Sequence, residues 1–309
     1  MKLVAHDRQM RTLLRQARRY AVVDANILIT GETGTGKDAL ARLLHAAGPR
    51  RREPFVTVDC PALPATLVEA ELFGHERGAF TDATMARPGR FETAGHGTLY
   101  LDAVTRLALS AQGALLRVVE ERRVTRLGGT AATDIQARII ASAEAEIEEA
   151  VRDGRMRAEL FHRLSVLPLR IPPLRERPDD ILPLARTFVE DAAARLKRQP
   201  PAIAREAEQA LLRYAWPGNV RELQHVMERV LLAGVGDTIA VASLPLDVLD
   251  APEAYLAPVA GQRPTLDEIE RRYIELTLLY AKGNQTRAAA ILGISRKALW
   301  EKRKRYGLR

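Results

Sequence analysis

The sequence predicts an α/β fold with a parallel sheet and a helical subdomain, followed by a small all-α domain. Three observations support this fold class. A glycine-rich loop, residues 31–38, lies between an apolar strand candidate and a helical pattern. Apolar strand candidates then alternate with helical patterns as far as Pro173, and only helical patterns follow. Such alternation favours a parallel sheet whose two faces are both covered by helices.

Each predicted element rests on its own hydrophobic pattern. The helix after the glycine-rich loop carries Leu40, Leu43 and Leu44 on one face, at the spacing of an α-helix. Short apolar runs predict the strands, and longer runs with a helical period predict the helices. The strands are expected at residues 26–29, 54–58, 98–101, 137–141 and 166–171, and further helices at 110–121, 178–197, 203–213 and 217–233.

A region rich in glycine and proline interrupts the helical patterns near the end of the chain. Residues 234–264 show no sustained period, which is typical of a linker. A compact helical segment follows it. We therefore expect an α/β subdomain at 1–172, a helical subdomain at 173–233, a linker at 234–264 and a helical domain at 265–309.

Bulk composition excludes several classes of protein. The 309 residues are 47% hydrophobic and 28% charged, which is ordinary for a globular chain of about two domains. No apolar run approaches the roughly 18 residues of a membrane span, and the start of the chain lacks a signal peptide. The single cysteine, Cys60, excludes an internal disulfide framework and is expected to pack as a small hydrophobe. We expect a cytoplasmic protein without membrane contact.

The net charge is concentrated at the end of the chain. Residues 282–309 hold nine basic residues and one acid, Glu301, which gives +8, the net charge of the whole chain. The remaining residues therefore balance to zero. A basic excess confined to a short helical segment is typical of a nucleic-acid-binding surface. We expect DNA as a partner of this segment.

The glycine-rich loop has the pattern G-x-x-x-x-G-K of a P-loop, between a strand and a helix. Its glycines let backbone N–H groups surround phosphates, and the helix N-terminus adds a positive dipole end. Lys37 would reach the β- and γ-phosphates of ATP, and the nucleotide would bring Mg2+. Asp38 stands where the pattern has Ser or Thr. The predicted nucleotide-binding residues are Gly31, Glu32, Thr33, Gly34, Thr35, Gly36, Lys37 and Asp38.

Several motifs in order identify a family resemblance. The stretch GHERGAFTDA, residues 74–83, resembles the GAFTGA loop of sigma-54-dependent transcriptional activators, a clade of AAA+ ATPases. The resemblance extends over nearly the whole chain and implies an AAA+ P-loop subdomain with a helical lid. The other matching segments are GTLYLD (97–102), RMRAELFHRL (155–164), IPPLRERPDDI (171–181) and WPGNVREL (216–223).

The resemblance implies roles for particular residues. Asp102 would hold magnesium, and Arg157 and Arg163 would act as arginine fingers on the nucleotide of a neighbouring subunit in a ring, expected to be hexameric. Arg221, at the sensor II position, would contact nucleotide from the lid. The loop would contact the sigma-54 RNA polymerase holoenzyme through Gly78, Ala79, Phe80 and Thr81.

The chain departs from the family pattern at the residues that carry the chemistry. Ala103 replaces the glutamate that polarises the attacking water, and Asp59 and Glu144 replace two asparagines. We consider two explanations, loss of hydrolysis, or relocation of the water-positioning role to Glu144 or Asp59. A fourth departure is Asp82, which replaces a glycine in the loop.

Residues 265–309 resemble the Fis-type helix-turn-helix of the same family. Thr265, Asn284 and Ser295 are expected to cap three helices, the first through a capping box with Glu268, and Gly293 makes the turn. The third helix would enter the major groove. We assign Ser295, Arg296 and Lys297 to bases and Arg303 mainly to phosphates, and we expect Ala288, Ala289, Leu292, Ile294 and Leu299 in the core.

Two functional hypotheses follow. In the first, a DNA-bound ring uses ATP to remodel the sigma-54 holoenzyme through Phe80 and Thr81. In the second, the chain binds ATP and DNA but hydrolyses ATP slowly or not at all. Ala103 and Asp82 favour the second, whereas the intact loop core and the arginines favour the first. Regulatory input would come from another protein or from a sensor domain outside this chain.

Overall fold

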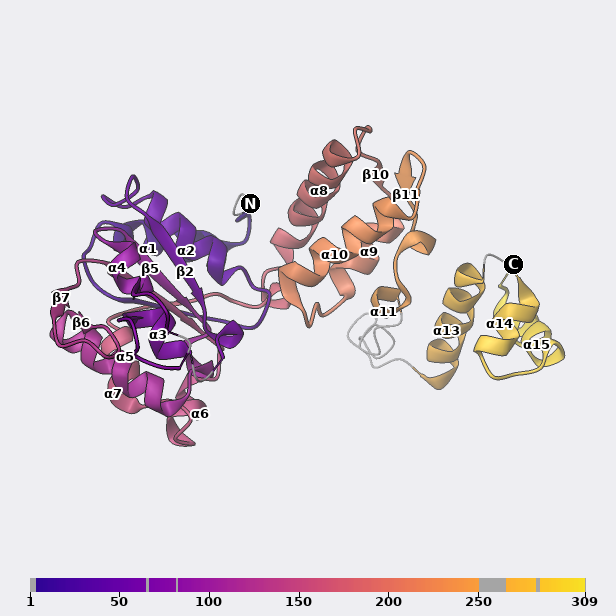
Figure 1. Cartoon of the computed structure of the whole chain (residues 1–309). Helices are drawn as coiled ribbons and strands as arrows, with labels where there is room; N and C mark the ends of the chain where they lie inside the picture. The colour runs from indigo at the N-terminus through magenta and orange to yellow at the C-terminus, as the bar shows by residue number, and fades with distance from the viewer. Residues whose placement is uncertain (1–3, 65–66, 82, 250–264, 282–283, 309) are drawn as a thin grey trace. The chain divides into compact units, whose positions relative to one another are not determined.

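The computed structural model describes residues 4–64, 67–81, 83–249, 265–281 and 284–308 (Figure 1). Two compact units divide the chain after Pro173. The first unit is an α/β layered structure, and the second contains the later helices.

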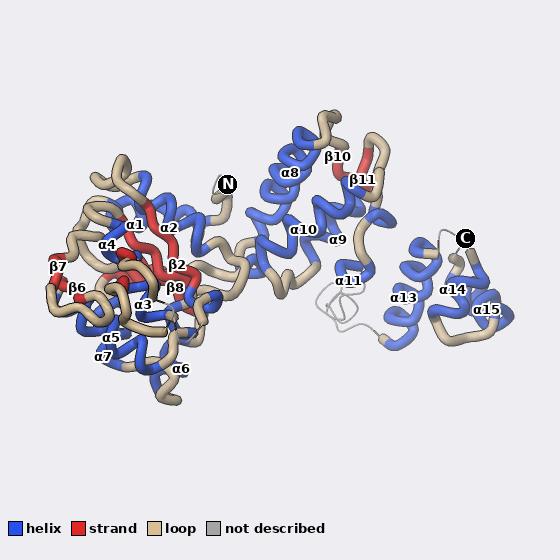
Figure 2. Tube along the Cα trace, viewed as in Figure 1, coloured by secondary structure: helices blue, strands red, loops and turns tan. Residues whose placement is uncertain are grey.

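A parallel five-stranded sheet forms the centre of the first unit (Figure 2, red). The strand order is β2-β5-β8-β1-β9, and every neighbouring pair is parallel. The strands are β1 (Ile27–Thr30), β2 (Phe55–Asp59), β5 (Thr98–Asp102), β8 (Arg138–Ala143) and β9 (Leu167–Arg170). Each of the five predicted strands is therefore confirmed, with bounds that differ by one or two residues.

The helices of this unit cover both faces of the sheet, as the alternating strands predicted. Side chains alternate along each strand, so Ile27 and Ile29 pack on one face and Leu28 on the other. Helices α1 (Arg8–Ala21) and α2 (Lys37–Ala46) share the Ile27 face. The opposite core includes residues of α3 (Val68–Phe73), α4 (Arg90–Ala94), α5 (Leu109–Glu121), α6 (Ile147–Arg152) and α7 (Ala158–Leu164).

Two short antiparallel hairpins accompany the main sheet, and the sequence patterns did not predict them. The first joins β3 (Gly74–His75) to β4 (Arg87–Pro88), and the second joins β6 (Arg123–Thr125) to β7 (Ala132–Asp134). A bridge between His75 and Leu127 connects the two hairpins. Strands of two or three residues carry too little periodicity to be recognised from sequence.

The second unit begins with three long helices, α8 (Pro178–Arg195), α9 (Arg205–Arg213) and α10 (Asn219–Leu232). The sequence predicted no strands after Pro173. This prediction was wrong, because β10 (Ala202–Ile203) pairs in parallel with β11 (Thr238–Ile239). Part of the predicted linker 234–264 is likewise structured. It contains β11 and α11 (Leu246–Leu249), with Ile239, Val248 and Leu249 buried. Residues 250–264 lie outside the described residues.

Three helices close the chain, α13 (Leu266–Tyr280), α14 (Gln285–Ile291) and α15 (Arg296–Tyr306). The predicted capping box is present, since the Thr265 N–H donates to Glu268 Oε2 at 2.7 Å and the Glu268 N–H to Thr265 Oγ1 at 3.3 Å. The Asn284 and Ser295 side chains cap the next two helices, and Gly293 adopts φ 65° at the turn. All five predicted core positions lie in the small apolar cluster of this domain.

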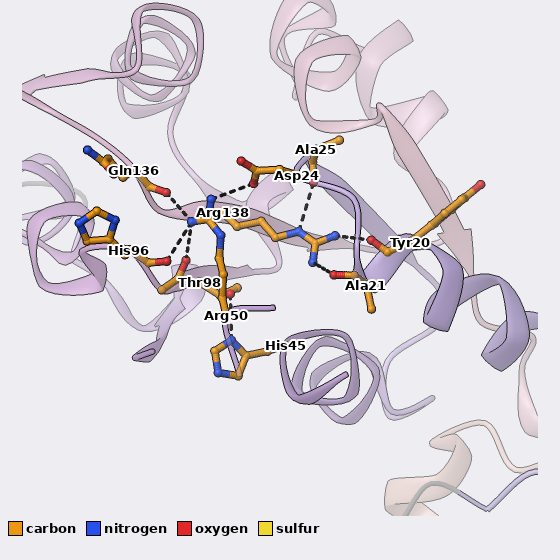
Figure 3. A network of polar contacts seen from close by, with 11 residues as sticks. Tyr20, Ala21, Asp24, Ala25, His45, Arg50, His96, Thr98, Gln136 and Arg138 are labelled. Atoms are coloured by element: carbon orange, nitrogen blue, oxygen red, sulfur yellow. Dashed lines mark hydrogen bonds and ion pairs between the residues drawn. The ribbon is translucent and has the colours of Figure 1, made fainter. Parts of the chain in front are cut away.

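A buried arginine fastens α1 to the sheet (Figure 3). Arg138, at the amino end of β8, is 4% exposed, and its guanidinium donates to the carbonyls of Tyr20 and Ala21 at 2.6 and 2.8 Å. These carbonyls end α1, where the helix dipole favours a positive charge. Burial lowers the pKa of Arg138 from its ordinary value. The guanidinium nevertheless remains a cation, because arginine is not deprotonated in proteins. Arg138 therefore joins a helix to the middle of the sheet.

We expect Arg138→Met to lower the free energy of unfolding by about 2–4 kcal/mol, because it leaves buried carbonyls at the end of α1 without donors. Urea denaturation followed by circular dichroism measures this loss. The matched control is Arg19→Met on the exposed side of α1, which should change stability by less than about 0.5 kcal/mol. Equal small effects of the two substitutions would contradict this role of Arg138.

Candidate functional site

The glycine-rich loop lies between the carboxyl end of β1 and the start of α2. β1 has β8 on one side and β9 on the other, so the chain order reverses there, which is where parallel α/β sheets bind ligands. Gly34 and Gly36 have φ values of 79° and 104°, in the left-handed region that glycine adopts without strain. A Cβ at Gly31 would lie 3.0 Å from the Ile171 carbonyl oxygen. The glycines therefore hold a backbone path that larger residues would disturb.

The lysine of this loop points back into it. Lys37 Nζ donates to the carbonyl oxygens of Gly31 and Glu32 at 2.7 and 3.0 Å. Thr35 is buried and its hydroxyl donates to the Glu32 carbonyl at 2.7 Å. The ammonium is thus held at the concave side of the loop, where a phosphate would replace the carbonyl contacts. Thr33 is exposed at the rim.

Asp38 is turned toward its own helix. Its carboxylate pairs with Arg42, one turn later, at 3.0 Å, and both side chains are about half exposed. The Arg42 guanidinium also lies over the Phe55 ring, 5.0 Å from its centroid. The Asp38 carboxylate is therefore paired along its own helix.

Asp102 ends β5 and is held by two hydroxyl groups. Its Oδ1 accepts from Tyr100 at 3.0 Å and from Ser142, on the neighbouring strand β8. The Ser142 hydroxyl oxygen in turn accepts from the backbone N–H of Ala103 at 2.9 Å. Ala103 has φ 54°, so its backbone is in the left-handed region. The carboxylate of Asp102 is therefore fixed at the carboxyl end of β5. The next residue, Ala103, has only a methyl side chain.

The two acidic replacements lie on either side of this position, as predicted. Asp59 ends β2 in register with Asp102 and is exposed. Glu144 follows β8 and forms an ion pair with Arg106 at 2.5 Å. The sequence patterns did not predict the Arg106 contact, which occupies one carboxylate oxygen of Glu144. Cys60 follows Asp59 and is buried. Burial is the main reason that its pKa is raised to about 12, and the charges of Asp102 and Asp59 contribute less.

The two predicted arginine fingers lie on the opposite face of the sheet from α2. Arg157 immediately precedes α7, and its Nε donates to the Leu109 carbonyl at 3.0 Å. Arg163 pairs with Glu120 of α5 at 2.9 Å. Both side chains are exposed. Their backbone belongs to the layer of α5 and α7, so both arginines face outward from this layer.

The WPGNVREL motif builds the start of α10. Trp216 and Asn219 both have positive φ values and are fully buried. Asn219 Oδ1 accepts from the Leu174 N–H at 2.7 Å, so the amide ties α10 to the beginning of the second unit. Arg221 lies in the first turn of α10 and is exposed. Most of the motif therefore has a structural role, and Arg221 is its exposed cation.

The loop 74–81 has a compact turn of its own. Gly78 adopts φ 82°, and its N–H donates to the Ala83 carbonyl at 2.8 Å. The Phe80 ring is half-buried and meets the His75 ring edge-on, with 4.9 Å between centroids. Thr81 is exposed, and Ala79 is partly covered. Asp82 lies outside the described residues, so its effect on the loop stays a prediction.

An arginine from the second hairpin fixes this loop, and sequence reasoning missed it. Arg126 forms two hydrogen bonds with Glu92 of α4, at 2.8 and 2.7 Å, and a third with Glu76 at 3.1 Å. The hydrogen bonds from Arg126 are the main reason that the pKa of Glu92 is lowered. Backbone contacts between Glu76 and Leu127 add to the connection. A pair of acids 16 residues apart gives no local pattern, so only the fold reveals the contact.

Helix α15 is strongly basic, and two of its basic side chains pair with acids of α13. Lys302 pairs with Glu270 at 2.5 Å, and Arg305 with Asp267 at 3.3 Å. Arg303 is half-buried. Lys304 lies over the ring of Trp300, which is 56% exposed. The side turned to solvent therefore carries Ser295, Arg296, Lys297, Trp300 and Lys304.

In the described part of the chain, no group of three or more His, Cys, Asp or Glu side chains is placed to bind a metal ion. No helix in the described ranges is long and apolar enough to cross a membrane.

The P-loop at a reversal of a parallel sheet, the acid at the end of β5, two strands away from β1, and the helical unit that follows define an AAA+ protein. Comparison with known families agrees with this class over three consecutive segments. Residues 3–170 match the Sigma-54 interaction domain, residues 175–257 the AAA+ ATPase lid domain, and residues 265–306 the bacterial regulatory protein, Fis family. The chain belongs to the sigma-54-dependent transcriptional regulators, and the predicted family resemblance is confirmed.

Similar proteins include curated regulators and a solved structure. The chain is 40% identical to transcriptional regulatory protein FlbD of Caulobacter vibrioides, over 98% of this chain and 70% of FlbD. It is 40% identical to regulatory protein AtoC of Escherichia coli, over 99% of this chain and 68% of AtoC. The crystal structure of NtrX from Brucella abortus in complex with ATP has a TM-score of 0.77 and 31% identity, over 99% of this chain and 70% of NtrX.

We expect Arg126→Met to speed amide hydrogen exchange in residues 76–81 at neutral pH, because the loop loses its ionic contacts with the second hairpin and α4. Exchange followed by mass spectrometry measures this change. Arg123→Met is the matched control, since Arg123 pairs with the exposed Asp134 of the same hairpin and not with the loop. Unchanged exchange in the Arg126 variant would show that the backbone contacts alone hold the loop.

The same pair gives a pH dependence with a definite sign. The pKa of Glu92 is lowered in the folded protein, so its contribution to stability is present above the unfolded pKa and is lost as the pH falls through the folded pKa. Unfolding measured from pH 6 down to about pH 3 should therefore show a loss of stability at the acid end that is smaller in Arg126→Met.

Proposed function

We propose that the chain is a nucleotide- and DNA-binding regulator that contacts the sigma-54 RNA polymerase holoenzyme and hydrolyses ATP slowly or not at all. One observation carries the proposal. The P-loop and Asp102 are arranged for a nucleotide, whereas the adjacent Ala103 offers a methyl group where the family resemblance expects a glutamate.

The P-loop geometry supports ATP as the nucleotide. Lys37 is held at the concave side of the loop by two carbonyl oxygens, and α2 begins there with Gly36 as its N-cap. Phosphates bind well at such helix starts because several N–H groups point at them. Asp102 fits the oxygen preference of Mg2+, and it would hold the ion together with phosphate oxygens. Bound magnesium would neutralise charge on the phosphates. NtrX, similar over nearly the whole chain, was crystallised with ATP.

The absence of a suitable base supports slow hydrolysis. Attack by water on the γ-phosphate requires a group that positions the water, and a misplaced group costs orders of magnitude in rate. Ala103 cannot accept a hydrogen bond through its side chain. Glu144 is held by Arg106, and Asp59 lies on the far side of Asp102 from β8. Neither carboxylate therefore takes the position of the glutamate side chain that Ala103 replaces.

A second candidate function is an active remodelling ATPase. It is favoured by the exposed arginines of α7, Arg157 and Arg163, which face outward from the layer opposite α2 and could reach a nucleotide bound to another copy. Such fingers stabilise charge in phosphoryl transfer. Glu144 would then leave Arg106 and position the water in a ring, expected to be hexameric. Arg221 would contact the nucleotide from the lid.

The loop and the last helix support the two macromolecular contacts. Phe80 and Thr81 lie at a turn that is fixed by its own hydrogen bonds and by Arg126 through Glu76, so the turn can be presented to polymerase without folding on contact. Ser295, Arg296 and Lys297 lie exposed at the start of α15, the part of a recognition helix that contacts base edges. We assign phosphate contacts to the exposed Lys304 and to Arg303, which is half-buried and therefore less accessible to DNA.

We expect Ala103→Glu to raise ATP turnover by roughly 10²–10⁴-fold with little change in ATP affinity, because a positioned carboxylate contributes a rate factor of this size. Ala103 already has a left-handed backbone, so the substitution adds no new strain of that kind. Steady-state phosphate release and equilibrium nucleotide binding measure the two quantities. The control is Ala103→Gln, which has a similar size and no carboxylate.

The second candidate function makes the opposite prediction. If Glu144 positions the water, Glu144→Gln abolishes turnover that the wild type already has, and Ala103→Glu brings no large gain. Substantial wild-type turnover that is lost in Glu144→Gln would therefore overturn the proposal of slow hydrolysis and establish the remodelling ATPase.

We expect the double substitution Arg296→Ala/Lys297→Ala to reduce discrimination between a selected DNA site and random DNA by at least tenfold, because each base contact is worth about 1–3 kcal/mol. Fluorescence anisotropy with both duplexes measures the ratio of affinities. Arg305→Ala is the matched control, since Arg305 forms an ion pair with Asp267 of α13. An equal loss on both duplexes would assign the two residues to phosphates.

A further inference from the structure

Helix α1 carries a row of arginines along its solvent side. Its apolar residues at positions 10, 13, 14, 17 and 21 are buried against β1, β9 and α2. The N-cap Asp7 accepts from the N–H groups of Gln9 and Met10, which fixes the start of the helix. On the other side every arginine is exposed. The arginine row consists of Arg8, Arg11, Arg15, Arg18 and Arg19.

The arginine row lacks the acidic partners that many other arginines of this unit have. Within the residues that the structure describes, none of the five forms an ion pair, and the hydrogen bond from Arg15 goes to the Thr12 hydroxyl. Close to α1 the situation differs, because Arg42 pairs with Asp38 and Arg50 with Asp24. Five arginines without an acidic partner therefore follow one another along one side of α1, which concentrates positive charge there.

This concentration does not stabilise the helix. Arg8 and Arg11, Arg11 and Arg15, and Arg15 and Arg19 are neighbours three or four residues apart, and like charges at these spacings destabilise a helix. Arg8 and Arg11 also lie near the positive end of the helix dipole, where anions are favoured. Only Arg18 and Arg19 are in the last turn, where cations are favourable. An anionic partner would remove this repulsion.

We propose that the arginine row of α1 binds the phosphate backbone of duplex DNA, as a second DNA contact besides the helix-turn-helix. The proposal rests on the proposed DNA-binding function. From Arg8 to Arg19 the row extends about 16 Å at the rise of an α-helix, which corresponds to about five phosphates of one strand. Exposed guanidinium groups bind phosphates in two-pronged geometry, and such contacts do not depend on base sequence.

The composition of α1 favours DNA over a lipid surface. A helix that lies on a membrane inserts its apolar side, and the apolar side of α1 is already buried in the core of the unit. DNA needs only the charged side. A sequence-independent contact on the α/β unit would add affinity to the sequence-specific contact made by the last domain, since linked contacts raise the overall affinity.

The salt dependence of DNA binding tests the proposal with the full chain. The variant is Arg11→Gln/Arg15→Gln/Arg18→Gln, and the probe is a random duplex of about 30 base pairs, titrated between about 50 and 200 mM salt. Each lost phosphate contact lowers the slope of log K against log salt by about 0.9, so we expect the slope to fall by about 2.7. Circular dichroism and thermal unfolding establish that the variant is folded.

The matched control removes three arginines that have acidic partners. Arg123→Gln/Arg155→Gln/Arg186→Gln changes the net charge by the same amount at three ion-paired positions. We expect its slope to stay close to that of the wild type. A folded α1 variant whose slope equals that of the control would overturn the proposal, because the row would then contribute no more than any other positive charge.

Two other outcomes also decide the question. If the wild-type chain binds neither the random duplex nor a selected site, the DNA-binding function itself fails, which is distinguishable from an unchanged slope. If the α1 variant keeps the wild-type slope but loses self-association in sedimentation, the row serves an acidic surface on another copy. That result would overturn DNA as the partner of α1.

Discussion

The parallel direction of the five sheet strands is the constraint on which the candidate site depends. Because β1, β2, β5 and β8 all run the same way, their carboxyl ends meet at one edge, and the P-loop, Asp59, Asp102 and Glu144 follow from that edge. An antiparallel strand would carry its terminal residues to the other edge. Arg138 supports the arrangement from the amino ends, where it joins α1 to β8.

The chemistry of this edge separates nucleotide binding from nucleotide cleavage. In the proposed function, binding needs the loop backbone, Lys37 and Asp102, and contacts within the protein hold both side chains in place. Cleavage needs one more group at a defined position, and Ala103 does not supply it. The acids gained on the neighbouring strands are not equivalent to a carboxylate at that position, since Glu144 is held by Arg106. These features are the basis of our proposal that the regulator binds ATP and hydrolyses it slowly or not at all.

The sequence was sufficient where patterns are local and insufficient where contacts are distant. The strands of the main sheet, the long helices other than α1, the P-loop and the caps of the last domain were predicted because each depends on residues close together in the chain. Short hairpins, the Arg106–Glu144 pair and the Arg126 contacts depend on residues that only the fold brings together. The α1 arginine row was missed because net charge over the chain outside 282–309 is zero, which hides a local excess. Part of the predicted linker holds β11 and α11, elements too short to show a period.

ATP affinity and steady-state turnover of the wild-type protein, measured over a series of protein concentrations, test most directly whether Ala103 leaves the site without a base. We predict tight ATP binding and turnover far below about 1 s⁻¹ at every concentration, because the loop is intact and the base is absent. Turnover of about 1 s⁻¹, an ordinary enzymatic rate, that rises cooperatively with protein concentration would contradict it. Such a result would mean that subunits complete one another's sites and that another acid replaces the missing glutamate.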